Sequence, residues 1–182
     1  MSTTGLDVFD KTIQTTNIWL DEVMARMGPD RHIAWHVLGA VLRALRDRLP
    51  LDDAAHLGAQ LPLLVRGLYY DQWHAPSTTL HKERHQEEFL ARVEEGLRDT
   101  RPVNAQEAVR TVFAVIAKHI AKGQAEKTAR VLPAEIRAMW PAPLGAQPED
   151  VAREVDDKER AERAQQDAKR QARQRAKESA AT

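Results

Sequence analysis

The chain has 182 residues, and its 27 basic side chains balance its 27 acidic ones, so bulk electrostatics does not imply a nucleic-acid or membrane partner. It contains no cysteine, which excludes disulfides, thiolate metal sites and cysteine nucleophiles. No stretch approaches the roughly 18 apolar residues of a membrane span, and the N-terminus lacks the basic start and apolar run of a signal peptide. We therefore expect a cytoplasmic protein.

In the first part of the chain, apolar residues at steps of three and four predict helices. The predicted helices are 15–27, 31–49, 53–60 and 62–70. Asp30 is placed to accept hydrogen bonds from the first free amides of the second helix, and Pro50 to end that helix. Proline lacks an amide hydrogen and fits the first helical turn, so the fourth helix is expected to begin at Pro62.

The second part of the chain repeats the first. Residues 34–69 recur at 105–140 with a constant offset of 71 and no gap. The identical pairs are Ala34/Ala105, Val41/Val112, Ala54/Ala125, Leu61/Leu132, Pro62/Pro133 and Arg66/Arg137. Upstream, after a single-residue indel, Trp19 matches Phe89 at an offset of 70. An internal repeat of this kind predicts two similar structural units and a pseudo-symmetry axis between them.

The repeat predicts four further helices, over 83–98, 104–121, 124–131 and 133–140. Asn104, with Glu107 three residues later, resembles a capping box. Gly123 is expected to end that helix in a left-handed conformation. Residues 71–79, which include Pro76, are expected to connect the two units.

The predicted fold is all-α: a compact bundle of about eight helices built from two pseudo-symmetric four-helix repeats. The duplicated domain covers residues 10–142, with repeats at 15–73 and 83–142. Residues 148–182 have acids crowded early, bases late and almost no large apolar side chain. We expect this segment to be a charged helical or disordered tail.

The repeated elements resemble the domain of unknown function 2267 family over residues 10–142. The resemblance lies in Trp19-Leu20-Asp21-Glu22-Val23 and its counterpart Phe89-Leu90-Ala91-Arg92-Val93, and in the Ala-rich long helix. It also lies in Gln60-Leu61-Pro62-x-x-Val65-Arg66-Gly67, which runs into Tyr69-Tyr70-Asp71-Gln72-Trp73. The family implies a small all-helical bacterial or archaeal domain and supplies no activity, ligand or catalytic residue.

Two histidine pairs have the spacing that places two imidazoles on one helical face: His32/His36 and His81/His85. A closed metal site needs a third and usually a fourth ligand, and no Glu-x-x-His pair like those of di-iron bundles is present. His81 and His85 are the better metal candidates. The simpler interpretation is a solvated first helical turn, so no cofactor is predicted.

Arg66 and Arg137 occupy equivalent places after each Leu-Pro, so a pseudo-twofold axis could bring both guanidiniums to one groove, where they would clamp a carboxylate or phosphate. The alternative is that each arginine covers its local helix and pairs with an acid of its own half. Near the junction of the halves, Tyr70, Trp73 and His74 form the best candidate for a recognition surface. Core packing is the competing explanation for these aromatic residues.

The basic end of the tail is the candidate for nucleic-acid contacts: Lys169, Arg170, Arg173, Arg175 and Lys177. Acids lie two to four turns away and no aromatic side chain is interleaved, so any such binding is expected to be weak.

The prediction for function is a non-enzymatic protein-interaction module that binds an unknown protein partner or itself. A small-ligand or metal-binding protein that uses the cleft between the repeats is one alternative, and nucleic-acid association through the tail is another. An enzyme is the less favoured class because no phosphate-binding loop, nucleophile elbow or His-Glu-x-x-His motif occurs.

Overall fold

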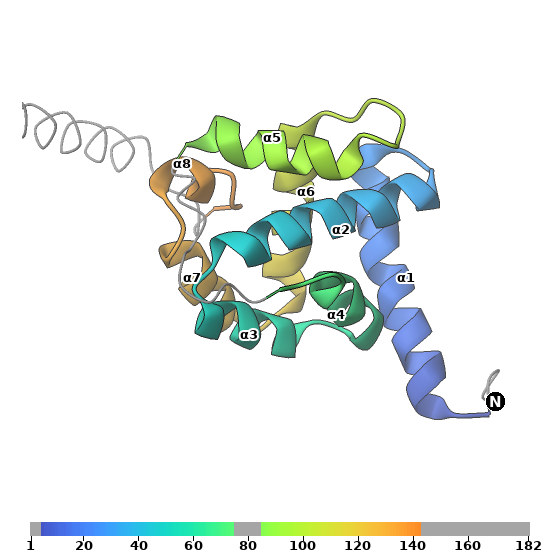
Figure 1. Cartoon of the computed structure of the whole chain (residues 1–182). Helices are drawn as coiled ribbons and strands as arrows, with labels where there is room; N and C mark the ends of the chain where they lie inside the picture. The colour runs from blue at the N-terminus through green and yellow to red at the C-terminus, as the bar shows by residue number, and fades with distance from the viewer. Residues whose placement is uncertain (1–4, 75–84, 143–182) are drawn as a thin grey trace, which may run out of the picture. The chain divides into compact units, whose positions relative to one another are not determined.

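The computed structural model describes residues 5–74 and 85–142, and these residues form eight α-helices and no strand (Figure 1). The helices are α1 (Asp7–Met27), α2 (Arg31–Arg48), α3 (Leu51–Gln60), α4 (Leu63–Tyr70), α5 (Gln86–Leu97), α6 (Ala105–His119), α7 (Lys122–Arg130) and α8 (Ala134–Arg137). The all-α prediction is confirmed. The tail 148–182 lies outside the described residues.

The helix boundaries follow the polar and proline signals in the sequence. Asp30 Oδ1 accepts hydrogen bonds from the backbone amides of His32 and Ile33 at 2.9 and 3.1 Å, which satisfies free donors at the start of α2. Asn104 caps α6 in the same way through the amide of Glu107 at 2.9 Å. Prolines precede α3, α4 and α8 as N-cap residues, where no amide hydrogen is needed.

Three boundary predictions are wrong. Helix α8 spans only Ala134–Arg137 rather than 133–140. Helix α1 begins at Asp7 rather than residue 15, because the apolar face of the helix continues upstream through Ile13 and Phe9. Gly123 was expected to end α6, but α6 ends at His119 with Ile120 as its extended C-cap. Gly123 instead lies in the first turn of α7.

The core comes from equivalent positions in the two repeats. Pairs buried in both copies include Trp19/Phe89, Val23/Val93, Leu38/Val109, Val41/Val112, Leu42/Phe113, Leu45/Ile116, Ala54/Ala125, Leu61/Leu132, Val65/Ile136 and Tyr69/Trp140. This agreement follows because apolar residues recur every three or four positions in both repeats, which places the same positions on the inner face of each helix. Trp19 and Trp140 are both buried.

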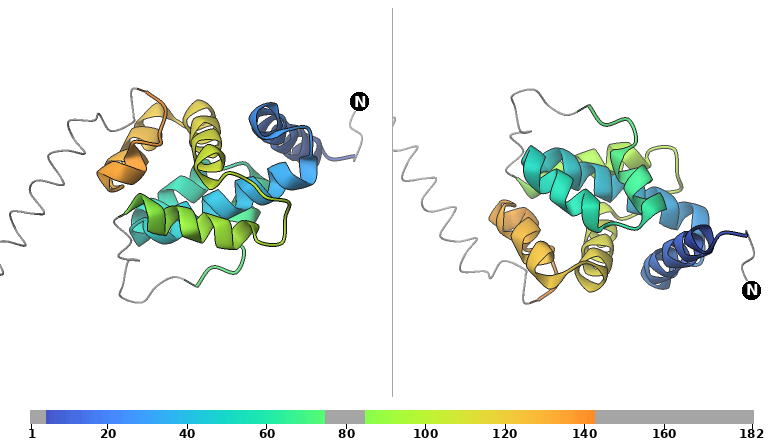
Figure 2. Two further views of the ribbon diagram at one scale, coloured as in Figure 1. Left: turned by 90° about the horizontal axis from the view of Figure 1, so that it is seen from above. Right: turned by 90° about the horizontal axis from the view of Figure 1, so that it is seen from below.

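The long helices of each half pack against helices of the other half as well as against those of their own. Helix α2 packs against α1 of its own half and equally against α5 of the other, while α1 also packs against α6 (Figures 1 and 2). At the α2–α5 contact a Cβ on Gly96 would lie 3.0 Å from Ala40 Cβ, so this position has room only for glycine unless the helices move apart.

These contacts fit a pseudo-twofold axis. Such an axis would exchange the α1–α6 and α5–α2 contacts, and would map the α2–α6 and α3–α7 contacts onto themselves. His56 and Lys127 are repeat equivalents, and Lys127 Nζ lies 3.4 Å from His56 Nδ1. A residue can touch its own equivalent only near the axis, so this contact marks where the axis would pass. The spatial symmetry itself stays a prediction.

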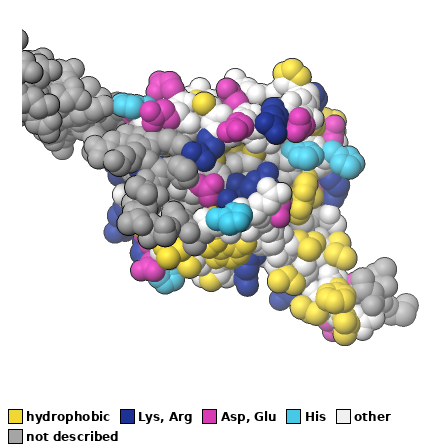
Figure 3. All heavy atoms as spheres, viewed as in Figure 1, with side chains coloured by type: hydrophobic (Ala, Val, Ile, Leu, Met, Phe, Trp, Pro, Cys, Tyr) yellow, Lys and Arg dark blue, Asp and Glu magenta, His cyan; other side chains and the backbone are white. Residues whose placement is uncertain are grey.

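The N-terminal half of α1 extends beyond the helices that cover the rest of it (Figure 1). Helices α7 and α8 lie on the opposite side of the bundle (Figure 2). Hydrophobic side chains gather on the projecting end of α1 (Figure 3), where Val8, Phe9 and Ile13 are 59%, 50% and 46% exposed. An apolar face left uncovered in this way typically marks an interaction surface.

Candidate functional site

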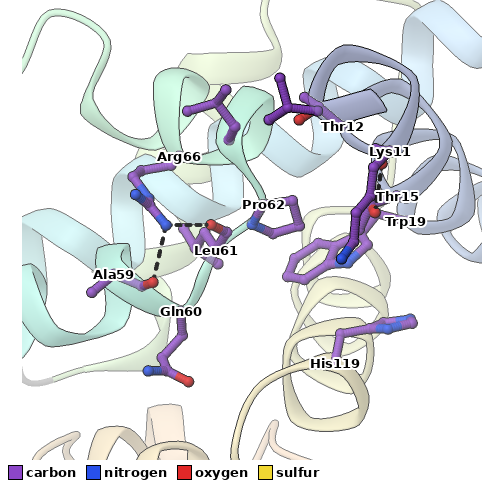
Figure 4. Close-up of a pocket in the computed structure, with 12 residues that line it drawn as sticks. Lys11, Thr12, Thr15, Trp19, Ala59, Gln60, Leu61, Pro62, Arg66 and His119 are labelled. Atoms are coloured by element: carbon purple, nitrogen blue, oxygen red, sulfur yellow. Dashed lines mark hydrogen bonds between the residues drawn. The ribbon is translucent and has the colours of Figure 1, made fainter. Parts of the chain in front are cut away.

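A groove of about 350 Å³ separates the N-terminal half of α1 from the turn between α3 and α4 (Figure 4). Helix α1 supplies one wall, with Lys11, Thr12 and Thr15 facing the turn. The opposite wall is the segment 59–63 with Arg66 of α4, and His119 from the end of α6 lies below. The groove therefore joins three parts of the chain that are far apart in sequence.

The floor of the groove is formed by two tilted aromatic rings and a group of hydrogen bonds. The rings of Trp19 and His119 lie 5.4 Å apart between centroids. His119 Nε2 is 2.9 Å from Glu22 Oε1, and Lys118 Nζ donates to the same oxygen at 2.6 Å. Partial burial raises the pKa of Glu22, but the hydrogen bonds from Lys118 and His119 outweigh that cost and leave the pKa below its ordinary value. The ionised carboxylate of Glu22 thus holds the His119 ring in place.

Arg66 closes the α3–α4 side of the groove. Its Nη2 donates to the carbonyl oxygens of Ala59 and Leu61, both at 3.0 Å, and so satisfies carbonyls at the C-terminal end of α3. Its Nε is buried and has no hydrogen-bond partner among the described residues.

Every ionisable side chain that lines the groove is basic: Lys11, Arg66 and His119. Within the described part of the chain, Lys11 Nζ makes no ion pair. The rim is apolar, with Val8 on one wall and Leu63, 54% exposed, on the other. The groove thus combines apolar contact surface with a cation that has no acidic partner in residues 5–74 and 85–142.

The structure places Arg66 and Arg137 in different surroundings. Arg66 binds carbonyls at the end of α3, whereas Arg137 ends α8 and does not line the groove that contains Arg66. Neither arginine forms an ion pair with an acid in the described residues. Arg66 thus contacts its own half through backbone carbonyls and not through an acid, so pairing with an acid of the same half also stays a prediction. The joint clamp stays a prediction.

Tyr70 and Trp73 pack against each other and against the first half of the molecule. Their ring centroids lie 5.3 Å apart, and the buried guanidinium of Arg46 lies 5.7 Å from the Trp73 ring. Arg46 also donates to the carbonyls of Tyr69 and Asp71 and pairs with Asp47 at 2.7 Å. This cluster fixes the end of α4, while His74 beside it is exposed and its Nδ1 lies 3.2 Å from Gln72 O.

The histidine pairs are only partly described. His32 and His36 are both exposed on α2. His81 lies outside the described residues, as do Lys169, Arg170, Arg173, Arg175 and Lys177. His85 is half-buried and meets Glu135, with 3.4 Å between His85 Nδ1 and Glu135 Oε1.

A comparison with protein families matches residues 16–139 to the model of the uncharacterized conserved protein family DUF2267. The chain belongs to the DUF2267 family. No curated protein matches the chain. The family match begins inside α1, so the first part of the groove wall, including Val8 and Lys11, precedes it. Among the described residues of this DUF2267 chain, no helix is long and apolar enough to cross a membrane.

The sequence patterns do not predict the groove. Its residues come from α1, the α3–α4 turn and α6, and only folding brings Trp19 and His119 together. The sequence contained one sign of an uncovered surface. Phe9 and Ile13 extend the apolar stripe of α1 upstream of the part that matches the second repeat.

Proposed function

We propose that this DUF2267 protein is a cytoplasmic, non-enzymatic interaction module, and that the groove between α1 and the α3–α4 turn binds an acidic amphipathic segment of a partner protein. The observation that carries the proposal is the composition of the groove: an apolar rim around ionisable side chains that are all basic. A peptide that fills it would place an apolar side chain between Val8 and Leu63. Its acidic side chain would pair with Lys11.

The energetics favour a segment with both features. Burial of an apolar side chain contributes about 1.5–3 kcal/mol, and apolar anchors in a pocket dominate binding at interfaces. A carboxylate opposite Lys11 would add specificity and speed of association more than affinity. The helical walls fit the recognition mode in which an amphipathic helix lays its apolar face into a groove.

The experiment is a selection of displayed random peptides on the full chain, followed by fluorescence polarisation with synthetic copies of the selected peptides. We expect them to carry apolar residues at helical spacing beside Asp or Glu. Leu63→Ser should weaken their binding by about tenfold or more, because it removes one side of the apolar rim. Lys11→Gln should weaken it less and should reduce its dependence on salt.

The chain offers matched controls. Leu51 begins α3 as Leu63 begins α4, and it is 50% exposed but does not line the groove. Leu51→Ser should therefore leave affinity unchanged, as should Arg110→Gln on the exposed side of α6. Selected peptides without acids, or equal losses from Leu51→Ser and Leu63→Ser, would contradict the proposal.

A further inference from the structure

A second constellation lies in the other half, where α5 begins and α8 passes it. Ligand atoms of His85, Glu87 and Glu135 all lie within 4.8 Å of one another. The three residues come from two segments about fifty positions apart, so the packing of α8 on α5 brings them together.

Glu135 is held in position by the backbone. Its Oε2 accepts the amide hydrogen of Gln86 at 2.9 Å, and its other oxygen faces His85 Nδ1 at 3.4 Å. The side chain is only 30% exposed. A hydrogen bond that orients a carboxylate beside an imidazole holds both side chains in position before a metal ion binds.

The electrostatics of this corner favour a bound cation. The carboxylates of Glu87 and Glu135 come within 4.8 Å of each other, and two like charges at that separation repel. A divalent ion between them would replace this repulsion with attraction to both. The imidazole selects among cations, because Mg²⁺ and Ca²⁺ prefer oxygen ligands whereas Zn²⁺ and similar ions accept nitrogen with carboxylate.

The first half has no counterpart to these ligands. At the repeat-equivalent positions it carries Thr15, Asn17 and Leu64 in place of His85, Glu87 and Glu135. The common scaffold of the repeat therefore does not require this constellation. Helix capping alone would need only one acceptor at position 135, and it does not account for the second carboxylate, Glu87, beside it.

We propose that His85, Glu87 and Glu135 bind one divalent transition-metal ion of the Zn²⁺ class. Three protein ligands leave at least one coordination position for water or for a group from another molecule. This site differs from the histidine pair suggested by sequence spacing, because its second and third ligands are carboxylates and it does not use His81. It is independent of the groove at α1.

The test is isothermal titration calorimetry of Zn²⁺ into the metal-free full chain, with cobalt substitution and visible absorption as a second readout. We expect one ion per chain. Glu135→Gln retains an acceptor for the Gln86 amide but removes the charge. Glu87→Gln changes an exposed residue and leaves the fold intact. Each should weaken Zn²⁺ binding by at least about tenfold, in the range known for lost supporting groups.

Two controls separate this site from ordinary surface histidines. The double variant His32→Gln/His36→Gln removes an exposed pair on α2, and His81→Gln removes the nearest histidine in sequence; both should keep the wild-type affinity. The proposal is overturned if wild type binds no Zn²⁺, if Glu87→Gln and Glu135→Gln bind as wild type does, or if either histidine control abolishes binding.

Discussion

The two halves of the molecule share a core and differ around it. Equivalent positions such as Val41 and Val112 are buried in both copies, whereas the perimeters have diverged in length and charge. Helix α1 spans Asp7–Met27, but its counterpart α5 spans only Gln86–Leu97. The difference teaches that the shared spacing of apolar residues, every three or four positions, is enough to specify the bundle. The surface around that core can change without disturbing it.

Two surface clefts show how far this divergence goes. One lies between α1 and α6 and is lined by Glu22, Ala25, Arg26, Ala114, Val115 and Lys118. The repeat equivalents of all six line a second cleft between α5 and α2: Arg92, Glu95, Gly96, Arg43, Ala44 and Asp47. The ion pair Glu22–Lys118 corresponds to Arg92 and Asp47 with the signs exchanged. The shape is repeated, but the charges are not.

A packing detail also differs between the halves. Gly58 in α3 lies under Tyr70, and a Cβ there would come within 2.1 Å of the tyrosine hydroxyl. The equivalents in the second half are Ala129 and Pro141. The first half thus packs a residue without a side chain against a large ring, whereas the equivalent positions of the second half hold no aromatic residue.

The largest expected effect tests the shared core. Leu45→Ala and Ile116→Ala truncate equivalent, fully buried side chains, and each should lower the free energy of unfolding by about 2–5 kcal/mol. Urea denaturation measures both. If one truncation were nearly neutral and the other severe, the idea of two equivalent half-cores would fail.

The next effect tests the Gly58–Tyr70 contact. Gly58→Ala should destabilise the protein by about 1–3 kcal/mol because the methyl group overpacks the Tyr70 ring, which is also confined by Trp73. In a Tyr70→Ala background the sign should reverse, since alanine favours a helix over glycine by about 0.5–1 kcal/mol. Thermal unfolding of the four proteins gives the coupling, and an equal cost in both backgrounds would exclude the contact as its cause.

The smallest effect concerns Glu22 and depends on pH. Its pKa in the folded protein is below the ordinary value of 4.5, so the ionised group stabilises the fold above that pH, and the contribution is lost as pH falls through the folded pKa. Glu22→Gln should cost about 0.2–1 kcal/mol at pH 7, because the partly exposed pair is screened by solvent. The difference from wild type should disappear in acid. Glu94→Gln, on the exposed face of α5, is the matched control variant.

The sequence predicted the helices and the core because both depend on local spacing. The apolar spacing of three and four that predicted the helices agrees with buried positions such as Leu45 and Ile116, and Asp30 and Asn104 marked helix starts. The sites could not be predicted in the same way. Glu135 meets His85 only after folding, and no local pattern relates residues fifty positions apart.

The exchange of contacts between the halves has a consequence for biosynthesis. The face of α2 that packs on α5, and the face of α1 that packs on α6, have no cover until the second half of the chain has been made. A nascent first half therefore leaves the ribosome with apolar surface exposed, and its native packing is completed only when the second half follows. Premature termination between the halves would yield an aggregation-prone fragment rather than a smaller functional domain.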